Sequence, residues 1–138
     1  MRNLVFALGA TLLVSSCARP EKPDWMIGTW QFQRPLAVNG PQPCAGGSDP
    51  RAYSRNGFYV EVNAAEYGRW EVKGKRLIHH VLRVRGREIP VKDRTDYIFR
   101  IDSRSTDRLD VNRGPDEQMT MIRCTSNPDG SFAADMPH

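Results

Sequence analysis

Apolar and polar residues alternate along most of the chain after residue 26, and this alternation predicts β-strands. In residues 58–63, for example, Phe58, Val60 and Val62 lie on one face of the predicted strand. No stretch of the chain after Cys17 keeps a 3.6-residue apolar period over three turns, so no long helix is expected. The pattern predicts strands at residues 27–33, 52–55, 58–63, 68–72, 75–84, 95–102, 109–111 and 117–124.

Residues with turn chemistry separate these strands. Asn56-Gly57 is typical of a type I′ hairpin turn, and Lys73-Gly74 and Gly114-Pro115-Asp116 mark later turns. The spacing of about eight short strands at intervals of about ten residues predicts an all-β antiparallel meander, closed as a barrel or folded as a β-sandwich. One connection is unusually long for a small domain: residues 34–50 form a predicted loop that is rich in proline and glycine and contains Cys44.

The first sixteen residues have the pattern of a secretory signal. Arg2 is followed by an apolar stretch at residues 4–14 and then by two serines. This stretch is too short to span about 30 Å of hydrocarbon as a helix, which takes about 20 residues. We therefore exclude it from the fold.

The residues Val14-Ser15-Ser16-Cys17 resemble the lipobox of bacterial lipoproteins. The resemblance implies acylation of Cys17 and cleavage before it, whereas the alternative is an ordinary signal peptide with an incidental cysteine. Several acyl chains would make anchoring permanent. Ala18 is not the aspartate that favours inner-membrane retention in Gram-negative lipoproteins, so the expected location is the outer membrane, facing the periplasm.

These features divide the chain into four segments. Residues 1–16 are the expected lipoprotein signal peptide, 17–25 the lipidated cysteine and spacer, 26–126 the barrel domain and 127–138 a polar tail. The whole chain has 20 basic and 16 acidic residues, a net charge of +4. This charge is too small and too evenly spread to indicate a nucleic-acid partner.

Once Cys17 is assigned to lipid, the chain retains two cysteines, Cys44 and Cys124. An oxidising compartment favours a disulfide between them. Closing a loop of about 80 residues would stabilise the fold by about 4.5 kcal/mol in the chain-entropy model. The alternatives are two separate thiols or, less favoured by spacing, metal ligation. In a closed barrel the first and last strands are neighbours, which suits this bridge.

Gly28-Thr29-Trp30 resembles the G-x-W signature of lipocalins and of small lipocalin-like bacterial lipoprotein domains of unknown function. Arg123 is similar in placement to the basic residue that packs over this tryptophan in the family. The resemblance implies a lipocalin-like barrel whose base is closed by Gly28, Trp30 and Arg123. A barrel this small can be filled by its own side chains, so the resemblance does not by itself imply a ligand cavity.

We find no catalytic constellation, no metal site and no cofactor motif, and we expect no enzyme activity. His79 and His80 are adjacent, so on a strand they point to opposite faces and cannot share a metal. Six aspartates and six arginines between residues 87 and 116 are interpreted as turn residues and exposed ion pairs. Arg83, Arg85 and Arg87 recur at strand spacing on one expected face.

Two functions remain open. The first is a binding module for a small apolar or amphipathic ligand, held in a barrel cavity lined by aromatic residues. The second is a protein-partner role in the envelope, as an inhibitor, immunity factor or complex subunit, with the loop at residues 34–50 as the contact. Four aromatic residues are the candidates for lining the cavity, although filling a small core is the interpretation that their pattern favours: Phe58, Trp70, Tyr97 and Phe99.

Overall fold

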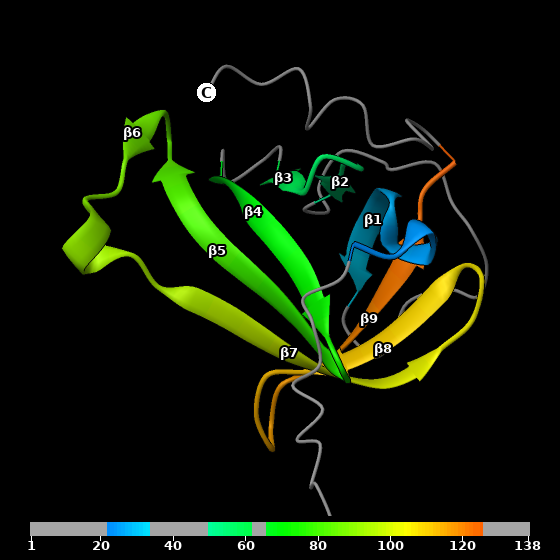
Figure 1. Cartoon of the computed structure of the whole chain (residues 1–138). Helices are drawn as coiled ribbons and strands as arrows, with labels where there is room; N and C mark the ends of the chain where they lie inside the picture. The colour runs from blue at the N-terminus through cyan, green and yellow to red at the C-terminus, as the bar shows by residue number, and fades with distance from the viewer. Residues whose placement is uncertain (1–21, 34–49, 62–65, 126–138) are drawn as a thin grey trace, which may run out of the picture.

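The computed structural model describes residues 22–33, 50–61 and 66–125 (Figure 1). Within them the chain forms β-strands and two short 3-10 helices, and among these residues no helix is long and apolar enough to cross a membrane. In chain order the elements are η1 (Asp24–Met26), β1 (Gly28–Gln33), β2 (Pro50–Tyr53), β3 (Phe58–Glu61), β4 (Glu66–Lys73), β5 (Arg76–Val84), β6 (Arg87–Glu88), η2 (Val91–Asp93), β7 (Asp96–Arg104), β8 (Arg108–Asn112) and β9 (Gln118–Arg123).

The sheet closes on itself. All strand pairs are antiparallel, each long strand pairs with the next along the chain, and β1 pairs with β9. The closed ring contains eight strands, in the order β1-β2-β3-β4-β5-β7-β8-β9, while β6 pairs only with β5. The predicted all-β, up-and-down barrel is therefore confirmed, in a form consistent with a lipocalin-like barrel, and the β-sandwich alternative is wrong. Closure removes the exposed edges that an open meander would leave.

Strand alternation divides the side chains into an inner and an outer set. In β4, for example, Gly68, Trp70 and Val72 are buried, whereas Arg69 and Lys73 are exposed. Gly68 lies opposite Tyr59 on β3, at a register shift between β4 and β5. A β-carbon at Gly68 would lie 2.7 Å from the Tyr59 ring and closer still to the carbonyl of His80. Only glycine fits where the strands approach this closely.

The first and last strands meet at one end of the barrel, which η1 covers. Trp30 is fully buried there and donates its indole N–H to the carbonyl of Met26 at 2.9 Å. The guanidinium of Arg123 lies 4.3 Å from the centre of the Trp30 ring. It also donates hydrogen bonds to the carbonyls of Ile27, at 2.8 Å, and Trp25, at 2.5 Å. Gly28 begins β1 at a φ of 126°, a conformation that favours glycine. The packing of Arg123 on Trp30 is thus as expected from the resemblance.

Side chains fill the middle of the barrel. The Trp70 and Tyr53 rings meet edge to face at 5.7 Å, and the His79 ring stacks on Tyr59 at 4.4 Å. A side chain with almost no accessible surface adjoins no void that could hold a water molecule. The largest such side chains, each less than 2 % exposed, are Trp30, Trp70, Tyr53, Tyr59, Met26, Leu77, Leu109, Met121, His79 and Val111.

Two details differ from the sequence-based expectation. The packed domain begins earlier than residue 26, because Trp25 packs against the core. Arg83, Arg85 and Arg87 do not share one strand face, because the chain turns at Arg85, where φ is +50°. Arg83 lies on β5, whereas Arg87 lies on β6, which folds back along it. Turn chemistry at Arg85-Gly86 thus breaks the apparent alternation.

Several predictions fall outside the described residues. They concern the signal peptide, acylated Cys17, most of its spacer, most of the loop around Cys44, and the polar tail at 127–138.

Candidate binding site

Polar side chains occupy the interior of the barrel at the end opposite η1. Arg51 on β2 and Glu61 on β3 are cross-strand partners whose side chains form an ion pair at 2.5 Å, and both are largely buried. The guanidinium of Arg51 also lies 4.4 Å from the centre of the Phe32 ring. Beside this pair, the hydroxyl of Tyr59 donates to the carboxylate of Glu66 at 2.7 Å. Burial raises the pKa of Tyr59, and the Glu66 charge raises it further, so the phenol keeps its proton.

A histidine lies deeper in the interior. The ring of His79 is fully buried, and its Nε2 is 3.0 Å from the hydroxyl of Tyr53. Its Nδ1 has no hydrogen-bond partner within the described part of the chain. Burial lowers the pKa of His79 well below its ordinary value, and the nearby Arg51 and His80 lower it further. The next residue, His80, points outward to Asp96 and Glu71, at 2.8 and 3.3 Å. The predicted opposite orientation of the two histidines is therefore confirmed.

The four aromatic residues expected to line a ligand cavity do not lie together. Trp70 and Phe99 are buried in the filled interior, and Tyr97 lies half-buried beside them. Phe58 points the other way, onto the outer surface of the barrel. Trp70, Tyr97 and Phe99 therefore pack in the barrel interior, whereas Phe58 lies on the outer surface.

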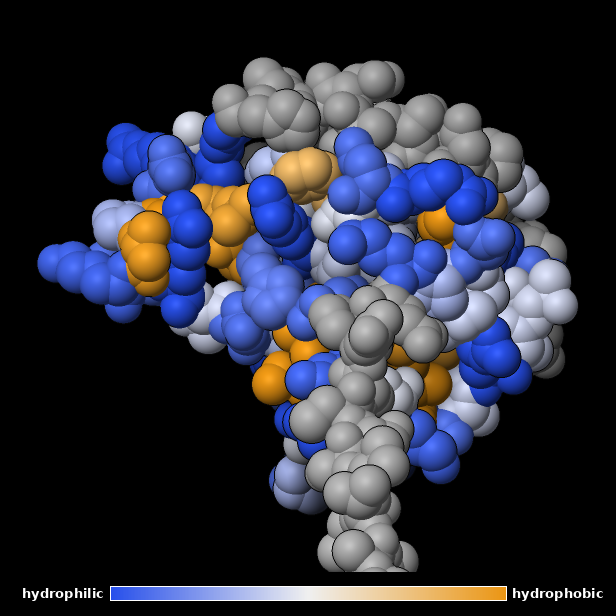
Figure 2. All heavy atoms as spheres, viewed as in Figure 1, coloured by the Kyte–Doolittle hydropathy of each residue, from blue (hydrophilic) through white to orange (hydrophobic). Residues whose placement is uncertain are grey.

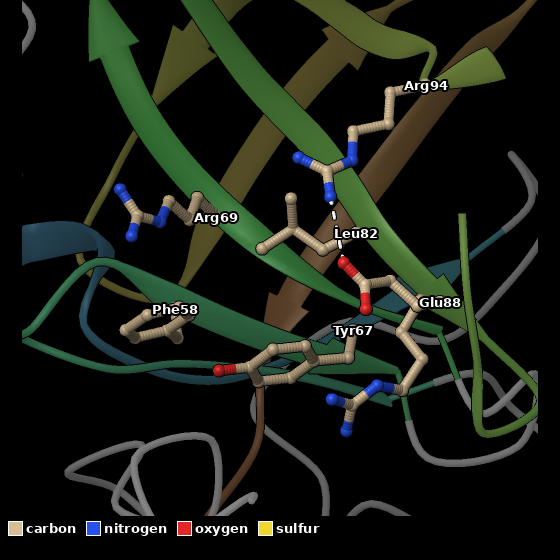
Figure 3. A pocket seen from close by; sticks show the side chains of 7 residues that line it. Phe58, Tyr67, Arg69, Leu82, Glu88 and Arg94 are labelled. Carbon is tan, nitrogen blue, oxygen red and sulfur yellow. Dashed lines mark hydrogen bonds and ion pairs between the residues drawn. The ribbon is translucent and has the colours of Figure 1, made fainter. Parts of the chain in front are cut away.

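An open groove of about 750 Å³ lies on that outer surface, across β3, β4, β5 and the β6 turn (Figure 3). We call it the outer groove. Phe58 and Tyr67 come from neighbouring strands and stack with ring centres 5.4 Å apart. Leu82 packs against the same small apolar cluster. The residues that line the outer groove are Phe58, Tyr67, Arg69, Leu82, Arg83, Glu88 and Arg94.

The charge of the outer groove is positive. Arg69 lies 5.3 Å from the Phe58 ring and Arg83 lies 5.6 Å from the Tyr67 ring, each in cation–π geometry. Arg94 is held by Glu88, the one acidic residue of the lining, at 3.1 Å, as the dashed line in Figure 3 marks. Three guanidinium groups and one carboxylate thus surround an aromatic and aliphatic floor, so positive charges outnumber negative ones in the lining. Burial raises the pKa of Tyr67 although Arg83 and Arg69 oppose it, so its hydroxyl can donate a hydrogen bond at neutral pH.

This arrangement suits an amphipathic anion. Guanidinium groups bind carboxylate or phosphate oxygens through paired hydrogen bonds. The apolar floor offers contact to a hydrocarbon chain or ring. Apolar surface also continues beyond the groove: Val84 is 37 % and Val91 77 % exposed, and Figure 2 shows apolar atoms gathered where β5, β6 and η2 lie.

Sequence reasoning missed most of this groove. The alternating pattern places Tyr67 in the break between the strands predicted at residues 58–63 and 68–72, and it does not distinguish Arg69 or Leu82 from other strand residues. One signal was available, since aromatic and basic residues occupy alternate positions on β4, with Tyr67 and Arg69 on the face opposite Trp70. The pairing of this face with Phe58 depends on the strand register, which the sequence does not state.

The described residues contain no group of three or more side chains of the kind that hold a metal ion. Cys124 is buried just after β9, and its N–H donates to the carbonyl of Thr29 on β1 at 2.8 Å. Its predicted bridge to Cys44 stays a prediction, because Cys44 lies outside the described residues.

The chain was also compared with known proteins. Neither family models, curated proteins nor solved structures gave a match.

Proposed function

We propose that this protein is a non-enzymatic binding module, tethered to a bacterial membrane, that holds a small amphipathic anion in its outer groove. The observation that carries the proposal is the composition of the groove. Phe58, Tyr67 and Leu82 supply an apolar floor, and arginines on β4, β5 and the β6–β7 connection supply positive charge.

The filled interior is the reason to place the ligand outside the barrel. A ligand among Trp70, Tyr59 and His79 would have to displace side chains that have almost no exposed surface. Opening such a core costs several kcal/mol for each large side chain removed from its contacts. In the outer groove Phe58 and Leu82 are partly exposed and Arg69 and Arg94 are exposed, whereas Tyr67 is only 3 % exposed and contributes mainly from beneath.

The membrane tether belongs to the same proposal. The lipobox-like residues Val14-Ser15-Ser16-Cys17 support acylation of Cys17, and Ala18 supports sorting to the outer membrane on the periplasmic side. A bridge between Cys44 and Cys124 fits this oxidising compartment. Metabolic labelling with a radioactive fatty acid tests the tether: the label should appear on the protein and disappear in Cys17→Ser. A label that persists in Cys17→Ser would contradict acylation at this residue.

The groove is tested by titration with matched amphiphiles. The mature chain is secreted with Cys17→Ser, so that it carries no lipid, and is titrated calorimetrically with dodecanoate, dodecyl phosphate and dodecanol below their micelle concentrations. The two anions should bind and the alcohol should bind more weakly, because only the anions can accept charge-assisted hydrogen bonds from arginine.

Arg69→Gln should weaken anion binding by about ten- to a hundredfold, since one charge-assisted hydrogen bond contributes about 1.5–3 kcal/mol. Leu82→Asp should weaken the binding of all three amphiphiles. The control is Arg100→Gln, on the outer face of β7, where Arg100 is paired with Asp102 and lies away from the groove lining. Equal affinity of the wild type, Arg69→Gln and Leu82→Asp for dodecanoate would refute the outer groove as the site.

A protein-partner role is the second candidate. It is favoured by the arm formed by β6 and η2, which extends beyond the barrel in Figure 1 and carries the exposed Val91. In-cell crosslinking from a photoreactive residue at position 91 should then capture one envelope protein. A residue placed at the exposed position 116 is the control. Identical capture from both positions would argue against a specific partner at the arm.

A further inference from the structure

The two ends of the barrel differ in charge. In an up-and-down barrel, alternate turns lie at the same end, so β2–β3, β4–β5 and β7–β8 turn at the end where η1 leads into β1. These turns and the η1 segment are residues 22–26, 54–57, 73–76 and 104–108. They carry seven basic and two acidic residues. The described turns at the opposite end, residues 85–96 and 113–117, carry five of each.

The excess charge at the η1 end is not neutralised within the described residues. Its two acidic residues are already engaged, because Asp24 pairs with Arg55 at 2.6 Å and Asp107 with Arg123 at 3.7 Å. Arg104 lies 4.5 Å from the Trp25 ring but forms no ion pair in the described structure. We call the exposed cations that have no carboxylate partner among the described residues the basic end: Lys22, Lys73, Lys75, Arg76 and Arg104.

Contacts between the turns keep these cations at one end of the fold. The carbonyl of Lys75 accepts a hydrogen bond from the N–H of Ile101 at 2.8 Å, which places the β4–β5 turn against β7, three residues before Arg104. The side chain of Lys22 packs over Gly57 in the β2–β3 turn. Lys22, where the described chain begins, therefore lies at the basic end.

We propose that the basic end docks on an anionic phospholipid surface and holds the opposite end of the barrel away from the membrane. The inference goes beyond the outer groove, and it uses the proposed tether only to bring the domain near the bilayer. Lysine and arginine side chains close to an anionic membrane surface each strengthen attraction about fivefold. Five cations that pair with no described carboxylate, at the end where the described chain begins, would orient the barrel as well as attract it.

The test uses the full, processed protein reconstituted in vesicles. A fluorophore is attached at the basic end through Ser105→Cys or at the opposite end through Asp116→Cys, both exposed turn positions. Nitroxide-labelled lipid headgroups then quench whichever label lies near the bilayer. On vesicles that contain phosphatidylglycerol, quenching at position 105 should exceed quenching at position 116 severalfold. The difference should disappear in high salt and on pure phosphatidylcholine.

Charge reversal supplies the matched variants. Lys73→Glu, Lys75→Glu and Arg76→Glu together should weaken docking by at least about a hundredfold, given about fivefold for each charge. Arg85→Glu, Arg87→Glu and Lys92→Glu change the net charge equally at the other end and should leave the quenching difference intact. All of these side chains are exposed, and circular dichroism checks that both variants fold.

Equal quenching of both labels on every vesicle would overturn the proposal, since the barrel would then turn freely on its tether. Stronger quenching at position 116 would overturn it as well. Failure of the tether has a separate signature: the protein would leave pure phosphatidylcholine vesicles while still binding anionic vesicles in low salt. If the outer groove does not bind amphiphiles, only the amphiphile titrations would show it, and the quenching results would be unchanged.

Discussion

The buried histidine predicts a specific loss of stability in acid. His79 has no exposed surface, hydrogen-bonds to Tyr53 through Nε2, and has no partner for Nδ1 within the described residues. Burial holds its pKa well below the ordinary value, with Arg51 and His80 adding to the effect. In the unfolded chain the same imidazole returns to a pKa of about 6.5.

The sign of the effect follows from which state binds the proton. Below about pH 6.5 the unfolded chain takes up a proton at His79 that the folded barrel does not, so acid favours unfolding. The free energy of unfolding is unaffected by this group above about pH 7 and falls by up to about 1.4 kcal/mol per pH unit below pH 6.5, until the folded-state pKa is reached. Between pH 7 and pH 5 the loss from this one group is at most about 2 kcal/mol.

Urea unfolding at pH 7, 6 and 5 measures this loss. Carboxylates also protonate in acid, so the comparison is with a variant that lacks the imidazole. Tyr53→Phe with His79→Phe replaces both partners of the hydrogen bond by apolar rings of similar shape, which can be nearly neutral at pH 7. This double variant should lose less stability than the wild type between pH 7 and pH 5, by up to about 2 kcal/mol. The control is His80→Gln, which removes a partly exposed imidazole on the outer face. It should lose nearly as much stability as the wild type between pH 7 and pH 5.

Equal loss in the wild type and in the double variant would refute the argument. It would mean that His79 is protonated as easily in the folded barrel as in the unfolded chain. The burial and hydrogen bonding of the ring would then not control its charge.

Three further substitutions test the packing, each by urea unfolding at pH 7. Arg123→Ala should cost about 2–4 kcal/mol, because it removes the cation–π contact with Trp30 and the hydrogen bonds to three backbone carbonyls, those of Trp25, Ile27 and Thr106. A cost below about 0.5 kcal/mol, as at ordinary surface sites, would contradict its role. Gly68→Ala should cost about 1–3 kcal/mol through overpacking between strands, and unchanged stability would show that the backbone relaxes freely there. Cys124→Ser should cost up to about 4.5 kcal/mol if the bridge to Cys44 forms. The intact mass of the wild-type protein with and without reductant should differ by two hydrogen atoms, and no difference would exclude the bridge.

The strands themselves were largely predictable from local sequence. Alternation in residues 58–61 and a turn at Asn56-Gly57 are local properties, and both appear in the structure. The turn is not the expected type I′, however, because only Gly57 has a positive φ, at 88°, and its N–H donates to the carbonyl of Ser54 at 3.1 Å. The boundaries differ by a few residues, as at β4, which begins at Glu66 rather than Gly68. Tertiary pairing with Val84 on β5 extends that strand beyond what its own pattern indicates.

The candidate site was much less predictable. Phe58 was singled out as a candidate for lining a cavity, but an aromatic residue on an alternating strand does not reveal which face is the inner one. The inner face of β3 carries Tyr59 and Glu61, so the polar-looking face points into the barrel, although Val60 on the outer face is buried as well. The ion pair with Arg51 offsets the cost of burying the Glu61 carboxylate.

The sequence by itself determined the all-β class, the turns, the lipobox-like segment and the pairing of Trp30 with Arg123 through its resemblance. Each depends on residues close in the chain or on a recognised motif. Only the tertiary structure decided that the interior is filled, that Phe58 meets Tyr67 and Leu82 in an outer groove, and that unpaired cations collect at one end. A period of two assigns side chains to two faces, but register and closure decide which face is inside and which distant residues become neighbours.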